Sequence, residues 1–164
     1  MGTTEDLKHA FAGESQASRK YLAFAKKAEQ DKFPMVARLF RAAAQAETVH
    51  AQAHFRVLGG VKDTAANLQD AAAGESEEFT AMYPPFVAEA KKEGNAAAER
   101  SFQYAMEVEK LHYALYQQAL AAVKGGKDIT ATAFYVCPVC GYTVENQAPG
   151  KCPLCGSPKF DEVK

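Results

Sequence analysis

The stretch AMEVEKLHYALY, residues 105–116, carries Glu109 and His112 three positions apart in a segment whose composition is typical of a helix. The stretch AETVHAQAHF repeats this Glu-x-x-His spacing at Glu47 and His50. Side chains three positions apart lie on one face of an α-helix, so each motif directs a carboxylate and an imidazole the same way. These two motifs decide the interpretation of the chain, because the faces that carry them should otherwise be apolar.

The first 124 residues are rich in Ala, Glu, Lys and Leu, and this composition predicts helices. Four helices are expected, running from Thr4 to about Asp31, from Pro34 to Gly59–Gly60, from Asp63 or Thr64 to about Gly94, and from Asn95 to Gly125–Gly126. Thr, Asp and Asn are typical N-caps, proline suits a first turn, and glycine ends a helix. Pro84 and Pro85 should kink or break the third helix. Four long helices predict a bundle.

Every expected core-facing stripe carries a carboxylate near its middle. These carboxylates belong to Glu14, Glu47, Glu75 with Glu78, and Glu109. A single charged residue on a core-facing stripe could occur by chance in one helix. The same feature in all four helices is not explained in that way. Buried carboxylates without partners cost several kcal/mol each, so a cluster of them requires a polycation. One Glu from each of two helices, with Glu-x-x-His from each of the other two, is the ligand pattern of di-iron carboxylate bundles, and such ligands suit iron or manganese.

All four cysteines fall near the end of the chain, as two Cys-Pro-x-Cys-Gly knuckles at Cys137, Cys140, Cys152 and Cys155. A disulfide scaffold would spread its cysteines through the fold, so we expect a tetrahedral four-thiolate metal site instead. The spacing leaves the metal open. Zinc would make the segment a structural ribbon, and iron would make it a one-electron carrier. We therefore divide the chain into a helical domain, residues 1–126, a linker, 127–133, and a turn-rich cysteine module, 134–164.

Composition excludes several classes of function. The 164 residues include 19 basic and 20 acidic side chains, which argues against a nucleic-acid-binding surface. No apolar run approaches the length of a membrane span. The N-terminal sequence MGTTEDLKHA does not resemble a secretory signal, so a cytoplasmic location is expected.

Five segments together resemble the rubrerythrin family, and the resemblance covers nearly the whole chain. They are AFAGESQASRKYLAFA, AETVHAQAHF, GESEEFTAMYPPF, AMEVEKLHYALY and YVCPVCGYTVENQAPGKCPLCG. The resemblance implies a mainly α fold, with a ferritin-like four-helix bundle followed by a rubredoxin-like module. It also implies two irons in a di-iron carboxylate centre and a third iron on the four cysteines, which zinc could replace in recombinant material.

The resemblance assigns a role to each ligand of the di-iron centre. Glu14 would be a terminal ligand of the first iron, and Glu47 and Glu109 would bridge the two irons. The second iron would be completed by Glu75 and His112. The family's first iron moves between two ligands as it changes oxidation state, and these correspond to Glu78 and His50.

Other polar residues near the motifs receive weaker roles. Tyr21 and Tyr83 match family tyrosines that hydrogen-bond near the cluster, although both could be ordinary core tyrosines. Glu77 matches no ligand and should face solvent. His54 should be packed or support a ligand, and His9 has no assigned role.

The implied reaction is reduction of hydrogen peroxide to water by the di-ferrous centre. Electrons would come through the four-cysteine iron from a rubredoxin or an NAD(P)H-dependent reductase. A ferroxidase or oxygen reductase is the enzymatic alternative, because the same core can react with oxygen. A zinc-ribbon interaction protein is the non-enzymatic alternative, but it leaves the seven ligand residues without a purpose.

The link between the second and third helices, Gly59 to Asp63, is too short for the crossover of a ferritin-like bundle. A helix of about 25 residues is about 37 Å long, whereas five extended residues span at most about 18 Å. Either the helices form a plain antiparallel hairpin, or two chains exchange helix pairs. We favour the domain-swapped homodimer. Each site would then take Glu14, Glu47 and His50 from one chain and Glu75, Glu78, Glu109 and His112 from the other.

Overall fold

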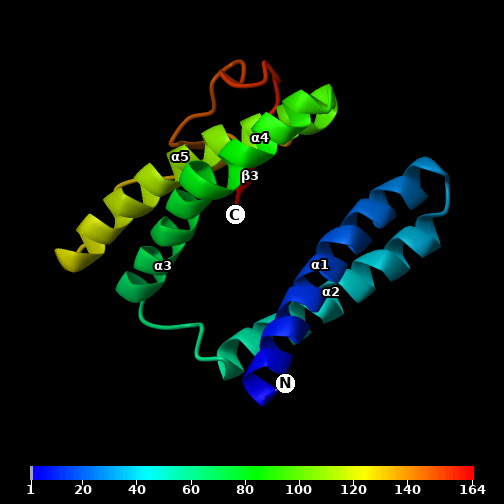
Figure 1. Ribbon diagram of the computed structural model, residues 1–164, viewed down its shortest axis with the longest axis horizontal. Helices are drawn as coiled ribbons and strands as arrows, with labels where there is room; N and C mark the ends of the chain where they lie inside the picture. The colour runs from blue at the N-terminus through cyan, green and yellow to red at the C-terminus, as the bar shows by residue number, and fades with distance from the viewer. Residues whose placement is uncertain (1) are drawn as a thin grey trace. The chain divides into compact units, whose positions relative to one another are not determined.

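The computed structural model describes residues 2–164 and confirms a mainly helical chain that ends in a small cysteine module (Figure 1). It consists of two compact units, one ending at Lys62 and the other running from Asp63 to Lys164. The first holds helices α1 and α2. The second holds the remaining helices and the three strands.

The first unit is a hairpin of α1 (Thr3–Gln30) and α2 (Pro34–Val57), which pack along each other (Figure 1). Small side chains fill the interface and allow close approach of the two backbones; they include Ser18, Ala25, Ala28, Ala37, Ala44 and Ala51. Pro34 occupies the first turn of α2, as predicted. The prediction of Thr4 as N-cap was wrong. Gly2 is the N-cap, two residues earlier, and no side chain caps the helix.

The helices of the second unit begin where the capping residues predict. The Asp63 side chain accepts a hydrogen bond from the Ala66 N–H at 2.8 Å, and α3 (Thr64–Glu77) follows. Asn95 caps α5 (Ala96–Lys124) in the same way, at 3.1 Å from the Ala98 nitrogen. Both bonds satisfy a backbone donor that has no partner within its own helix.

The predicted break at Pro84 and Pro85 takes the form of a π-helical segment. Helix α3 passes into η1 (Glu78–Met82), which leads into α4 (Tyr83–Lys92). The Tyr83 N–H bonds to the Glu78 carbonyl, five residues back, rather than four. Both prolines lie in the first turn of α4, where the hydrogen-bond ladder is already shifted, so their missing N–H groups disrupt it little.

The cysteine module is built on a three-stranded antiparallel sheet in the order β2-β1-β3. Its strands are β1 (Phe134–Val136), β2 (Thr143–Glu145) and β3 (Asp161–Val163). In the register of the sheet, Tyr135 pairs with Val144 on one side and Glu162 on the other. Strand β2 contacts α5, which brings the module against one helix of its own unit.

Candidate metal centres

One group of potential metal ligands lies within the α1–α2 hairpin. Oxygen or nitrogen atoms of Glu14, Glu47 and His50 lie within 4.8 Å of one another. Nδ1 of His50 is 2.9 Å from Oε2 of Glu47, across the three-residue spacing of the motif. Glu14 and Glu47 are half-buried, while the imidazole is exposed. We call this group the first triad.

A second group lies between α3 and α5. Glu75 faces Glu109 and His112, and ligand atoms of the three lie within 4.8 Å of one another. Nδ1 of His112 is 2.9 Å from Oε2 of Glu109 and 3.6 Å from Oε1 of Glu75. All three residues are half-buried. We call this group the second triad.

The second triad concentrates negative charge in a poorly solvated place. Burial and the neighbouring Glu109 carboxylate raise the pKa of Glu75 to about 7. Burial also raises the pKa of Glu109, with Glu78 contributing repulsion. A divalent or trivalent cation would remove this repulsion, and carboxylate oxygens with an imidazole nitrogen are donors that iron accepts. The donor set therefore fits the metal that the sequence motifs predict.

The remaining predicted acidic and histidine residues lie around the triads. Glu78, on η1, is half-buried and close enough to raise the pKa values of Glu75 and Tyr83, but its oxygens are not part of the second triad. Glu77 is exposed, as predicted, and so is His9. His54 is half-buried and lies outside both triads.

The tyrosines divide between the two units. The pKa of Tyr83 is raised by burial and by Glu78, Glu109 and Glu75, which places its hydroxyl near the second triad. Tyr21 packs instead in an aromatic cluster, with ring centroids 6.3 Å from Phe24 and 6.2 Å from Phe40.

Sequence reasoning missed Tyr116 as a site residue. Burial, Glu75 and Glu109 raise its pKa, and its ring centroid is 6.5 Å from that of His112. The available signal was its position four residues after His112, on the same helical face. An aromatic residue at that spacing is typical of the apolar stripe of a helix, so the spacing alone does not mark it as a site residue.

The four cysteine sulfurs form a compact cluster in the module. Cys137 and Cys152 are buried, and all four sulfurs lie within 4.8 Å of one another. The Cys137–Cys155 and Cys140–Cys152 Sγ pairs are each 3.5 Å apart. That spacing exceeds the bonded distance in a disulfide, about 2.05 Å, and approaches the about 3.8 Å edge of a tetrahedron with metal–sulfur bonds of about 2.3 Å.

Backbone amides support the sulfurs. Burial opposes ionisation of Cys137, but hydrogen bonds from the Cys140 and Val139 backbones lower the pKa of its thiol to about 6. The two knuckles repeat one geometry. The Gly141 N–H donates to the Cys137 carbonyl and the Gly156 N–H to the Cys152 carbonyl, each at 2.9 Å. Both glycines have positive φ, +81° and +76°, a conformation in which other residues would be strained.

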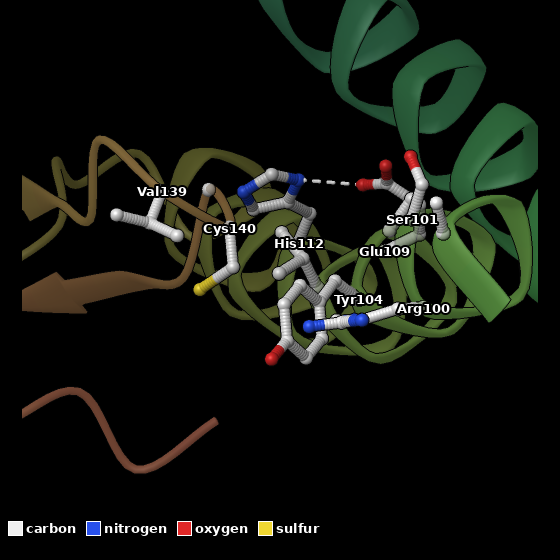
Figure 2. Close-up of a pocket in the computed structure, with 11 residues that line it drawn as sticks. Arg100, Ser101, Tyr104, Glu109, His112, Val139 and Cys140 are labelled. Atoms are coloured by element: carbon white, nitrogen blue, oxygen red, sulfur yellow. Dashed lines mark hydrogen bonds and ion pairs between the residues drawn. The ribbon is translucent and has the colours of Figure 1, made fainter. Parts of the chain in front are cut away.

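A cleft of about 490 Å³ separates α5 from the first cysteine knuckle. Figure 2 shows Val139 and Cys140 on the knuckle side, with His112 between them and Glu109. Arg100, Ser101 and Tyr104 line the rest of the cleft from α5. The second triad and the four-cysteine cluster are therefore neighbours within one unit.

Two family models match this chain. Residues 5–120 match the rubrerythrin family model, and residues 135–160 match the model described as the rubrerythrin rubredoxin-like domain. The chain belongs to the rubrerythrin family. Rubrerythrin-2 of Clostridium acetobutylicum is 38% identical to it, over 96% of this chain and 93% of that protein. Nigerythrin of Nitratidesulfovibrio vulgaris is 37% identical, over 96% of this chain and 83% of its own.

Solved structures of nigerythrin agree with this rubrerythrin assignment. The mixed-valence state aligns with a TM-score of 0.57 at 34% identity, covering 99% of this chain and 88% of the nigerythrin chain. The fully reduced, all-ferrous state gives a TM-score of 0.58 at 33% identity over the same shares.

Membership of the rubrerythrin family makes this chain an iron-dependent oxidoreductase. It has a di-iron carboxylate site composed of Glu and His side chains and a rubredoxin-like four-cysteine site. Within residues 2–164, no helix is both long enough and apolar enough to cross a membrane.

Proposed function

We propose that this rubrerythrin-family chain is a peroxidase that reduces hydrogen peroxide to two water molecules, consuming two electrons and two protons. The observation that carries the proposal is the cleft in which the Cys140 knuckle faces the helix of Glu109 and His112. An iron-storage protein has no need for a one-electron site beside its ferroxidase ligands. An enzyme that must be re-reduced after every turnover does need one.

Seven side chains would hold the two irons of the active centre. They are Glu14, Glu47, His50, Glu75, Glu78, Glu109 and His112. When bound, two adjacent irons supply the two electrons and polarise the peroxide oxygens. The first triad contains three of the five residues proposed for the first iron, because Glu78 and His50 would alternate there. The second triad contains three of the four proposed for the second, since both bridging carboxylates serve each metal.

The chain's own polar groups would orient the substrate. A tyrosine with an ordinary pKa of about 10 is already protonated at neutral pH, and burial raises the pKa of Tyr83 and Tyr116 further, so either hydroxyl can donate a hydrogen bond to a peroxide oxygen. Tyr21, which packs against Phe24 and Phe40, would serve the aromatic core of the first unit rather than the substrate.

Electrons would enter through Cys137, Cys140, Cys152 and Cys155. A rubredoxin or an NAD(P)H-dependent reductase would deliver them one at a time, and the exposed side of the first knuckle, at Val139, would receive that donor. Val139 is 65% exposed, so its side chain would be accessible to such a donor.

The protein would work as a domain-swapped homodimer. Each unit holds one triad, and the connection after α2 is short. The α1–α2 hairpin also exposes a set of large apolar side chains, which a partner's helices would cover: Leu22, Phe24, Met35, Val36, Leu39 and Val49.

An anaerobic stopped-flow experiment tests the peroxidase proposal. The fully reduced, iron-loaded protein is mixed with one equivalent of peroxide, and separately with oxygen, while the ferric–thiolate absorption is followed. Rapid colour with peroxide and slow colour with oxygen would support a peroxidase whose metal sites exchange electrons. Rapid colour with oxygen alone would establish the oxygen-reductase or ferroxidase reaction instead. A colourless protein with zinc on its cysteines would remove the proposed electron path.

A further inference from the structure

The imidazole of His112 is held from two sides by different parts of the second unit. Its Nδ1 faces Oε2 of Glu109 at 2.9 Å within α5. Its Nε2 lies 2.9 Å from Oγ1 of Thr143, the first residue of β2 in the cysteine module. A residue of the four-cysteine module therefore contacts a side chain of the second triad directly.

The proton on the ring can be assigned from the hydroxyl's own bonds. Thr143 Oγ1 donates to the Gly141 carbonyl at 3.0 Å. A hydroxyl has one proton, so Oγ1 can only accept from the imidazole. His112 therefore carries its proton on Nε2. In the metal-free chain the 2.9 Å contact between Nδ1 and Oε2 of Glu109 needs a proton of its own, and a metal bound there would displace that proton and take the Nδ1 lone pair.

We propose that Thr143 is a positioning residue, which fixes the Nε2–H tautomer and the orientation of His112 and so raises the metal affinity of the second triad. The connection also ties that triad to the first cysteine knuckle, because Gly141 follows Cys140 in the chain. This inference rests on the proposed ligand role of His112, and it extends that role to a residue of the other metal module.

His50 provides an internal comparison. Its Nδ1 makes the same 2.9 Å contact with the glutamate of its own motif. Among residues 2–164, no side chain bonds to Nε2 of His50 as Thr143 does for His112. The two ring environments can therefore be told apart in one protein.

The experiment uses the full chain with zinc on its cysteines and the triads free of metal. Ring nitrogens labelled with ¹⁵N report the tautomer of each histidine by NMR. We expect Nε2 of His112 to be protonated throughout in the parent and in Thr143→Ser, which keeps the hydroxyl. Thr143→Val keeps the shape but loses the acceptor, so its His112 should populate both tautomers. Thr130→Val, at an exposed linker position, should behave like the parent.

Titration with Co²⁺, followed at the His112 ring signals, measures the consequence for metal binding. Thr143→Val should weaken binding by about tenfold or more, and Thr143→Ser should restore it. An unchanged tautomer in Thr143→Val would overturn the inference, and so would loss of affinity in Thr143→Ser as well. Neither readout depends on turnover. If the peroxidase proposal failed, the role of Thr143 in positioning His112 could still be correct. If the role of Thr143 failed, the peroxidase proposal would be unaffected.

Discussion

Nδ1 of His112, on α5, lies 3.6 Å from Oε1 of Glu75, on α3, so the second triad joins these two helices. Burial and the neighbouring Glu109 carboxylate raise the pKa of Glu75 to about 7, and burial also raises the pKa of Glu109. Two carboxylates this close cannot both ionise without repulsion. The metal ligands are thus a source of instability whenever no cation is bound.

The metal-free protein should therefore lose stability as the pH rises. The pKa of Glu75 is about 7 in the folded chain, against an ordinary value of 4.5. Between these values the folded chain holds a proton that the unfolded chain releases, so the free energy of unfolding falls with rising pH. At pH 8, Glu75→Gln should be more stable than the parent by about 1 to 2 kcal/mol, as measured by denaturant unfolding after chelation.

Glu77→Gln is the matched control for this measurement. Glu77 lies two residues away on the same helix and is exposed, so its replacement should leave the pH profile of the parent unchanged. Parallel pH profiles for Glu75→Gln and the parent would contradict the assigned pKa shift.

Removing a bridging carboxylate should stop turnover without affecting the cysteine site. Glu109→Ala should lower peroxide turnover by at least about 100-fold, because metal-based stabilisation of the reaction is worth several kcal/mol. The visible spectrum of the four-cysteine iron should remain. The control is Glu107→Ala, on the exposed side of α5 and paired with Lys110 at 2.6 Å. Retained turnover in Glu109→Ala would remove the bridging assignment.

Removing one thiolate should have the opposite effect. Cys155→Ser should abolish the visible spectrum and block re-reduction by a reductase, because the four-sulfur site loses one ligand. A chemically reduced di-iron site should still react once with peroxide in rapid-mixing experiments. Ser157→Ala serves as control, since the backbone bond to the Cys155 sulfur survives that change. Multiple turnovers by Cys155→Ser with the reductase would show that electrons enter elsewhere.

Complementation between inactive chains tests the domain swap. Glu47→Ala disables the first triad and Glu109→Ala the second, so each variant alone should be inactive. In a swapped heterodimer one site combines both changes and the other is intact. Random mixing of equal amounts on co-expression should therefore restore about a quarter of parental activity. A heterodimer without activity, or a monomer with full iron content by light scattering, would establish that each site is completed within one chain.

Local signals in the sequence predicted most of the helix boundaries and the metal-ligand motifs. Pro34, Asp63 and Asn95 act on the turn that follows them, so their effect can be read without knowing the tertiary fold. The three-residue spacing of Glu109 and His112 likewise needs only the geometry of one helix.

Contacts between distant segments could not be read in this way. Thr143 contacts His112 although the two residues are 31 positions apart in the sequence. A threonine at the start of a strand gives no local signal of an imidazole partner. Tyr116 fits the apolar stripe of its helix by spacing, and its hydroxyl gains importance only through the carboxylates of Glu75 and Glu109 on two helices. The predicted N-cap at Thr4 was wrong because local sequence signals define the start of a helix only to within a residue or two.

The π-helical segment η1 can be regarded as a one-residue insertion that the protein has absorbed. Residues of an α-helix advance by about 100° each, so an extra residue would normally turn everything beyond it to a different face. The wider turn between Glu78 and Met82 takes up that rotation locally. Glu75 and the packing face of α4 can therefore keep the orientations they would have in a helix one residue shorter. The insertion leaves one widened turn of backbone at Glu78, one of the two residues that the family resemblance matches to the alternating ligands of the first iron.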